Sequence, residues 1–341
     1  MRLRQEFLRE SLDCVSELES NSRMTPPLVS VVTPVYNGEK FLRECIDSVL
    51  AQAFDDWEYV VLDNASTDAT AEIVKAYAQK DHRIRYVRNE RTLPQLQNWN
   101  RSMTLIDPGA KYCKVVHADD VLFPECLARM VGVAAANPSV VIVGAYRIDG
   151  ATVNMMSIPY PQEVVSGQEL CRRRLLGQVQ DLFGSPTSIM YRADVVRERS
   201  EFFCLDNLHA DTAVCFDLLR QGDYGFVHQV LTFTRRHGAS ESTAMRRTGT
   251  HSIGRLKIAQ KYGPDFLTPA QQRFAVNLQL RYHYDFLGAN ILRFRDPDFR
   301  RYQMNMLETC GVPISPVRLA SAAGVSLLRS LWRSARRRQA P

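Results

Sequence analysis

The sequence lacks a long hydrophobic run. In its 341 residues the longest weakly polar stretch, Leu319 to Leu328, is too short to cross a bilayer. Residues 1–23 mix charged side chains with Leu and Phe, so no apolar segment precedes a signal-peptide cleavage site. We therefore expect neither a transmembrane helix nor a secretory signal.

The eight cysteines also lack the spacing of a metal or redox motif. No two of them form a CxxC pair, and most lie in apolar surroundings. They are expected to be reduced core residues of a cytoplasmic protein.

A dominant basic surface is missing as well. The formal net charge is only +6, and the excess is concentrated near the C-terminus in Arg329, Arg333, Arg336, Arg337 and Arg338. A local basic tail of this kind argues against a nucleic-acid partner. The hydrophobic content of 45% is ordinary for a globular protein with a sizeable core.

What is present is an alternation of strands and helices. Apolar, β-branched runs predict strands at 28–36, 57–62, 84–87, 112–116 and 140–146. Apolar residues at helical spacing predict helices within 39–54, around 73–77 and at 98–105. This order predicts an α/β fold with a mixed, mostly parallel sheet flanked by helices. The turn from Thr33 to Gly38 contains a single Gly, which nearly excludes a dinucleotide-binding GxGxxG loop and a dehydrogenase.

Two adjacent carboxylates, Asp119 and Asp120, follow the predicted strand at 112–116. Ligands collect at the carboxyl ends of strands in open α/β sheets, and paired Asp oxygens suit Mg²⁺ or Mn²⁺. The alternative is that both residues turn the chain or cap a helix that starts near Pro124.

Four motifs, taken in order, resemble the family 2 glycosyltransferases of the GT-A fold. They are VVTPVYN at 31–37, DNASTD at 63–68, NWN at 98–100 and HADD at 117–120. The resemblance covers about residues 28 to 240. It implies an inverting enzyme that moves a sugar from a nucleotide diphosphate donor to an acceptor hydroxyl, in polysaccharide, glycolipid or glycoconjugate synthesis.

The resemblance also implies a nucleotide pocket. Its expected residues are Thr33, Pro34, Tyr36, Asn37, Asp63 and Asn98. Asp63 would accept a hydrogen bond from the base, and because the imide N–H of uracil or thymine suits a carboxylate, a UDP- or dTDP-type donor is favoured. The alternative is that Asp63 belongs to an Asx-turn in a polar connector.

The family's metal motif is commonly Asp-x-Asp-Asp, and His117 takes its first position here. By resemblance, Asp119 approaches the ribose or the metal, and Asp120 ligates a Mg²⁺ or Mn²⁺ ion that bridges the diphosphate. His117 either contacts the ribose or is a satisfied core histidine.

Three further residues come from the resemblance. Asp211, near a helix N-terminus, matches the general base, although Ala210 stands where a Glu is common, and a capping role is the alternative. In the loop at 233–240, Arg236 is expected to bind phosphate and His237 phosphate or the metal; an exposed basic pair is the alternative. Ser185, Thr187 and Ser188 are softer candidates for contacts with the sugar or the acceptor. Because His117 and Ala210 depart from the pattern, a catalytically silent nucleotide-sugar binding module is the competing function.

The chain is predicted to have four parts. These are an amphipathic leader at 1–24, the GT-A domain at 25–245, a helical extension at 246–315 and a basic amphipathic tail at 316–341. The extension packs on the GT-A domain, forms a homo-oligomer or shapes the acceptor site. The tail is either a solvated helix or an interfacial helix that places a cytoplasmic protein on the inner face of the membrane.

Overall fold

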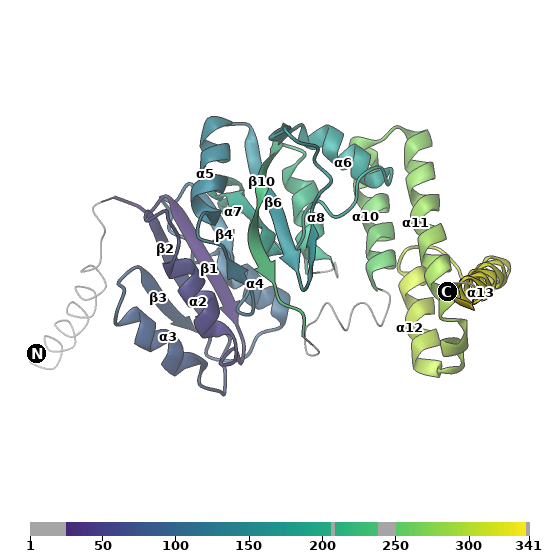
Figure 1. The fold of residues 1–341 in the computed structure, drawn as a ribbon, viewed down its shortest axis with the longest axis horizontal. Coiled ribbons are helices and arrows are strands. Elements are labelled where there is room, and N and C mark those ends of the chain that lie inside the picture. The colour runs from purple at the N-terminus through teal and green to yellow at the C-terminus, as the bar shows by residue number, and fades with distance from the viewer. Residues whose placement is uncertain (1–24, 206–208, 238–249, 339–341) are drawn as a thin grey trace, which may run out of the picture.

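The computed structural model describes residues 25–205, 209–237 and 250–338, so the expected leader lies outside the described residues. A ten-stranded sheet forms its centre, in the order β3-β2-β1-β4-β9-β6-β10-β5, with β7 beside β6 and β8 beside β10 (Figure 1). The strands are β1 Val29–Val35, β2 Trp57–Asp63, β3 Ile84–Arg88, β4 Tyr112–Val115, β5 Val121–Leu122, β6 Val140–Asp149, β7 Thr152–Asn154, β8 Val164–Val165, β9 Ile189–Arg192 and β10 Asp223–Thr234. The longest ladders, β1 with β2 and β6 with β10, are parallel, which confirms the predicted fold class.

Strand β1 determines where a ligand can bind. It pairs in parallel with β2 on one side and with β4 on the other, so the strand order reverses between β1 and β4. All seven residues of β1 are buried, as expected for a β-branched run inside a covered parallel sheet. In such sheets a crevice forms at the carboxyl ends of the strands where the order reverses. Here those ends lead into Asn37 and into the segment from His117 to Asp120.

Helices cover both faces of the sheet. The buried residues of α2 Leu42–Leu50, α3 Thr70–Ala78 and α5 Cys126–Ala136 share one apolar cluster with β1 and β2. Those of α4 Gln95–Met103, α6 Gly167–Leu175, α7 Ala193–Arg197 and α8 Ala210–Leu218 belong to the cluster on the other face. Helix α2 is shorter than the predicted 39–54 because a turn precedes it, in which the Phe41 amide donates to the Gly38 carbonyl at 3.0 Å.

The helical extension packs on the α/β domain, which is one of the three alternatives left open by the sequence. It contains α10 Thr250–Phe266, α11 Pro269–Ala289, α12 Pro297–Glu308 and α13 Pro316–Arg338. Tyr262 of α10 stacks on Phe216 of α8 with ring centroids 5.2 Å apart. Figure 1 shows these helices beyond α6 and α8, at the end of the molecule opposite β3.

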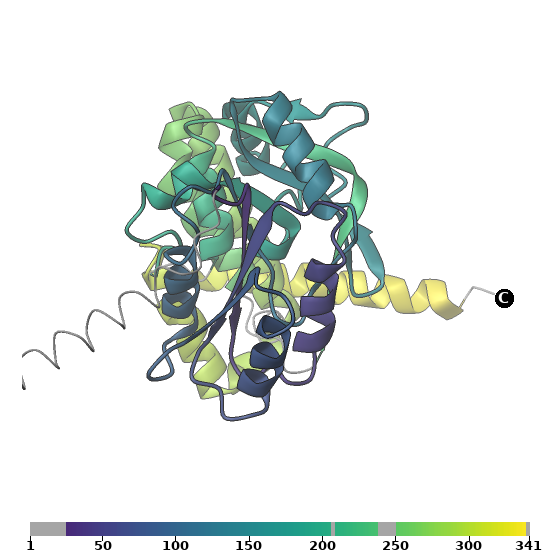
Figure 2. The same ribbon diagram turned by 90° about the vertical axis from the view of Figure 1, so that its left-hand side faces the viewer.

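Helix α13 is the predicted basic tail, and it packs on the extension by one side. A Cβ added at Gly288 of α11 would lie 2.4 Å from the Ala322 carbonyl carbon, so only glycine permits this approach. Figure 2 shows α13 extending past the rest of the molecule. Its large exposed apolar side chains are Val317, Val325, Leu327, Leu328 and Trp332. Within the described ranges, no helix is both long and apolar enough to span a membrane.

Candidate active site

The acidic pair lies where the sequence predicts, just beyond the carboxyl end of β4. The Asp120 amide donates to the His117 carbonyl at 3.0 Å, and this tight turn directs the chain into β5. Helix α5 begins only at Cys126, its N-cap is Glu125, and it receives no side-chain cap. Neither aspartate therefore caps a helix, and the capping alternative is wrong.

Asp120 is buried, with one carboxylate oxygen left open. Its side chain is 2% exposed, and Oδ1 accepts a hydrogen bond of 3.1 Å from the Arg235 amide. Oδ2 has no hydrogen-bond partner among the described residues. Burial raises the pKa of Asp120 from 3.8 to about 6; the His117 ring opposes this shift and the Asp119 carboxylate adds to it. Burying a carboxylate oxygen costs free energy unless a cation or a hydrogen-bond donor contacts it.

Asp119 is more exposed and has a partner that the sequence analysis also named. Its Oδ2 lies 3.0 Å from His237 Nε2, and the His237 ring packs 5.3 Å from that of Phe41. Arg235 binds the same turn from the other side, since its Nε donates to the Asp119 carbonyl at 3.1 Å. The segment that directly follows β10 thus brings Arg235 and His237 to the acidic pair.

His117 is not a satisfied core histidine. Its ring stacks on Trp99 with centroids 4.7 Å apart, and Nδ1 lies 3.9 Å from Asp120 Oδ2. Its Nε2 is buried and has no hydrogen-bond partner in the described part of the chain. The backbone is held by Thr187, whose hydroxyl accepts from the His117 amide at 3.1 Å. An open ring nitrogen beside an open carboxylate oxygen is a polar pair suited to a ligand.

The carboxylate of Asp63 lies at the carboxyl end of β2, completely buried. It accepts hydrogen bonds from the Ser66 amide at 2.8 Å, from the Tyr86 hydroxyl at 2.7 Å and from the Arg88 guanidinium. Burial opposes ionisation, but the hydrogen bonds from Ser66 and Tyr86 and the charge of Arg88 together hold the Asp63 pKa below its ordinary value. A carboxylate has about four acceptor positions, so these partners leave little capacity for a base.

The turn after β1 is joined directly to the loop after β2. Asn37 adopts a positive φ of 50°. Its amide donates to the Ser66 hydroxyl at 2.9 Å, and its Oδ1 accepts from the Thr67 amide at 2.8 Å. Tyr36, 53% exposed, is the one large side chain of this turn that is open to a nucleotide.

Two of the expected pocket residues do not line a pocket with their side chains. Thr33 is completely buried, and its hydroxyl is bonded to the Val116 carbonyl at 2.8 Å and to the Tyr59 hydroxyl at 2.9 Å. Pro34 is buried within β1. The Thr33 side chain points into the core because alternate residues of a strand covered on both faces point into the two cores, so Thr33 could line a nucleotide pocket only with its backbone.

Asn98 belongs to a buried amide network. Its Oδ1 accepts from Asn89 Nδ2 at 2.8 Å, and the same Asn89 nitrogen donates to Asn64 Oδ1 at 2.7 Å. Asn64 also exchanges hydrogen bonds of 2.8 and 2.9 Å with the backbone of Leu93. The network positions the loops after β2 and β3. Asn98 is therefore connected to the site through Asn89 and Asn64.

Asp211 lies in the first turn of α8 and lines a cavity. His209 is the N-cap residue, so Asp211 is not the cap; its Oδ1 accepts from the Thr212 amide at 2.7 Å. The cavity has a volume of about 490 Å³. The polar and charged side chains that line it include Asp211, Arg236, Arg147, Asp149, Arg174 and Arg255. This size is typical of a small-molecule site.

Arg236 is already paired. Both ends of its guanidinium donate to the Asp149 carboxylate, and Arg147 reaches the same carboxylate at 3.3 Å. Burial opposes ionisation of Asp149, but the hydrogen bond from Arg236 and the charge of Arg147 lower its pKa. To bind a phosphate, the Arg236 guanidinium would have to divide its hydrogen bonds between Asp149 and the phosphate. Arg235, which the sequence analysis did not name, contacts the acidic turn directly.

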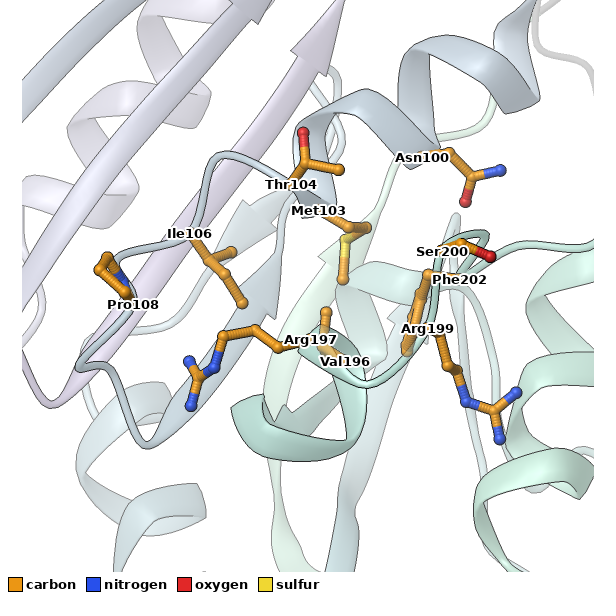
Figure 3. Close-up of a pocket in the computed structure, with 10 residues that line it drawn as sticks. All are labelled: Asn100, Met103, Thr104, Ile106, Pro108, Val196, Arg197, Arg199, Ser200 and Phe202. Atoms are coloured by element: carbon orange, nitrogen blue, oxygen red, sulfur yellow. The ribbon is translucent and has the colours of Figure 1, made fainter.

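The other cavity, of about 440 Å³, lies away from these groups (Figure 3). Ile106 and Pro108 line it and precede β4, so the cavity lies toward the amino end of that strand. Asn100, which belongs to the third motif, lies at its rim, and its side-chain amide bonds to the backbone of Phe203 at 2.7 and 2.8 Å. Asn100 therefore fixes the chain at Phe203.

The residues around Asp120 fit a cation that a substrate helps to hold. Within the described residues, no three His, Cys, Asp or Glu side chains are gathered as a complete metal cage. Mg²⁺ is usually bound by one or two carboxylates and completed by phosphate oxygens and water. The open Oδ2 of Asp120 next to Asp119 is the arrangement that this mode requires.

Several site residues were missed by the sequence analysis. Arg235, Asn64 and Asn89 carry ordinary residue types, and only tertiary contacts bring them to the site. Thr187 was only a soft candidate; it is fully buried, and its hydroxyl accepts a hydrogen bond from the His117 amide. The position of Arg235 directly before Arg236 was the one available signal.

Comparison with known proteins identifies the family. Residues 30–199 match the family model described as Glycosyl transferase family 2. The chain is 39% identical over 108 residues to the uncharacterized glycosyltransferase MJ1057 of Methanocaldococcus jannaschii, covering 31% of this chain and 37% of that protein. It is 29% identical over 149 residues to the glycosyltransferase GlyG of Streptococcus pneumoniae, covering 43% and 47%. The chain thus spans less than half the length of these two curated relatives. It belongs to glycosyl transferase family 2.

Solved structures share the fold. S. aureus TarS 1-349 in complex with UDP-GlcNAc superposes with a TM-score of 0.61 at 18% identity, covering 87% of this chain and 88% of that one. The mannosyltransferase PcManGT from Pyrobaculum calidifontis, in complex with GDP-Man and Mn2+, has a TM-score of 0.52 at 14% identity, with 94% of each chain covered. These likenesses confirm the predicted GT-A architecture.

Proposed function

We propose that the protein is an inverting glycosyltransferase that moves a sugar from a nucleoside diphosphate sugar to an acceptor hydroxyl. The observation that carries this proposal is the open, buried Oδ2 of Asp120 beside Asp119, at the end of β4 where the strand order reverses. Relatives of the family are named glycosyltransferases, and a solved structure with this fold holds UDP-GlcNAc.

In the proposed site the nucleotide lies across the ends of β1 and β2. Tyr36 offers an exposed ring, Asn37 fixes the turn, and Asp63 with Arg88 forms the polar floor. A UDP- or dTDP-type donor suits this floor, because a carboxylate position that remains open accepts an imide N–H. The diphosphate would then reach Arg235 and the acidic turn.

Asp120 and Asp119 would hold Mg²⁺ or Mn²⁺, with His237 orienting Asp119. Such an ion, once bound, neutralises the charge that develops on the departing diphosphate. A solved structure with this fold contains Mn2+. His237 Nε2 lies 3.0 Å from Asp119 Oδ2, and a ring N–H at that position donates to the carboxylate, which is the contact expected of a residue that orients a metal ligand.

Asp211 would be the general base. Its carboxylate lies in the first turn of α8 and accepts a hydrogen bond from the Thr212 amide. In a single displacement it takes the proton of the acceptor hydroxyl while that oxygen bonds to the anomeric carbon. The bond from that carbon to the diphosphate breaks at the same time, which inverts the configuration.

The test is Asp211→Asn in the full chain, assayed with UDP-sugars, Mn²⁺ and candidate acceptors. Transfer should fall by roughly 10²–10⁴-fold, which is the usual contribution of a general base. The thermal shift caused by UDP and Mn²⁺ should remain. Asp298→Asn, whose side chain is 81% exposed on α12, is the matched control and should retain wild-type turnover. If nucleotide binds the wild type but no sugar is transferred or hydrolysed, the chain is a silent binding module.

We also propose that α13 rests on an anionic membrane surface. It carries six arginines and no acidic residue, so its formal charge of +6 equals the formal net charge of the whole chain. Leu327 and Leu328 are 63% and 67% exposed, and Trp332 is 58% exposed. Exposed leucine and tryptophan together with many arginines are typical of a helix that lies in the membrane interface.

A further inference from the structure

The cavity in front of Asp211 contains more positive charge than its own carboxylates balance. Asp149 is shared by Arg147 and Arg236, and Asp181 lies 3.9 Å from Arg147. Arg174 on α6 and Arg255 on α10 line the same cavity. In the described part of the chain, neither of their guanidinium groups forms an ion pair or a hydrogen bond.

The two unpaired guanidiniums also disfavour each other. Burial, with the neighbouring charge of Arg255 as the next cause, lowers the pKa of Arg174 to about 10. Like charges brought together in a poorly solvated cavity raise each other's free energy until a counter-ion arrives. Arginine forks bind phosphate and carboxylate with two parallel hydrogen bonds, so a pair of them is well suited to one oxyanion.

We propose that Arg174 and Arg255 bind an anionic group, phosphate or carboxylate, carried by the acceptor. This proposal rests on the proposed function, because it places the acceptor in the cavity that Asp211 lines. An acceptor held by its anionic group would present its hydroxyl to Asp211 within the same volume of about 490 Å³.

The donor diphosphate is a poorer occupant of this position. The acidic turn formed by Asp119 and Asp120 does not line the cavity, and its basic neighbour is Arg235. Arg236 lies between the two sites, but Asp149 binds its guanidinium. The cavity is therefore the acceptor side, and the acidic turn is the donor side.

The experiment measures binding of sn-glycerol 3-phosphate, D-glycerate and glycerol to the full chain by calorimetry in EDTA. The first or second compound should bind the wild type and glycerol should not. Arg174→Gln and Arg255→Gln should each weaken this binding at least about tenfold, the usual effect of losing a charge-assisted hydrogen bond. Both variants should unfold no lower than the wild type, because each removes a repulsion.

Two controls separate this site from the donor site. Arg301→Gln, on the exposed surface of α12, should bind like the wild type, and Arg235→Gln should also retain anion binding. The thermal shift with UDP and Mn²⁺ should be unchanged in Arg174→Gln and Arg255→Gln. If the wild type itself shows no such shift, the proposed function fails, and the calorimetric measurement of anion binding still tests the acceptor proposal. Equal binding of glycerol, no binding of either anion, wild-type affinity in both variants, or loss in Arg235→Gln alone would overturn the acceptor proposal.

Discussion

The substitution Asp120→Asn tests the buried carboxylate at the centre of the proposed donor site. The amide keeps an oxygen for the Arg235 N–H, and it removes the charge whose burial raises the Asp120 pKa from 3.8 to about 6. The difference of about two pKa units corresponds to about 3 kcal/mol. In the metal-free protein at pH 7.5, the variant should therefore be more stable than the wild type by up to that amount.

The effect should depend on pH in a defined direction. The folded wild type binds a proton at Asp120 more tightly than the unfolded chain does, so its stability gains from protonation. This gain is complete below about pH 4 and is lost as the pH rises through about 6. The advantage of Asp120→Asn should thus be largest above pH 6 and disappear toward pH 4.

Thermal unfolding in EDTA measures this difference. A chain of 341 residues has an unfolding entropy of about 0.7 kcal/mol/K, so about 3 kcal/mol raises the melting temperature by about 4 °C. Adding Mn²⁺ and UDP should stabilise the wild type and leave Asp120→Asn unchanged. A variant that melts below the wild type at pH 7.5, or that still responds to Mn²⁺ and UDP, would refute the reasoning. Asp298→Asn controls for charge removal at an exposed position.

Two further predictions concern the amide network and the last helix. Asn89→Ala should lower the free energy of unfolding by about 1–3 kcal/mol in urea titrations, because Asn64 and Asn98 lose their shared donor. Asn305→Ala, at an exposed position, is the control. An unchanged urea midpoint in Asn89→Ala would contradict the structural role of the network. Leu327→Ser combined with Leu328→Ser should reduce sedimentation with phosphatidylglycerol vesicles several-fold, while Met304→Ser, on α12, should not. Wild-type binding that is equal on phosphatidylcholine or insensitive to salt would count against the electrostatic contact.

Local sequence predicted strands β1, β2, β3, β4 and β6 and the order of the motifs, but not β10, the longest strand. A run such as Val29–Val35 can only be satisfied in a sheet covered on both faces, and polar residues that follow such runs must gather at the sheet's carboxyl edge. The acidic turn at Asp119 and Asp120 was predictable for this reason. The neighbouring positions of the ends of β1 and β2 were predictable for the same reason.

The tertiary structure decided which of these side chains are open to a ligand. Thr33 and Asp120 both lie at strand ends, yet the Thr33 hydroxyl is satisfied in the core, whereas Asp120 Oδ2 has no hydrogen-bond partner among the residues that the structure describes. Likewise, Arg235 and Arg236 are adjacent in sequence, but Arg235 pairs with Glu44 and Arg236 with Asp149. Hydrogen-bond satisfaction depends on partners that are distant along the chain. The packing of α6 against α10 brings Arg174 and Arg255 to the same cavity, and no local sequence pattern predicts this.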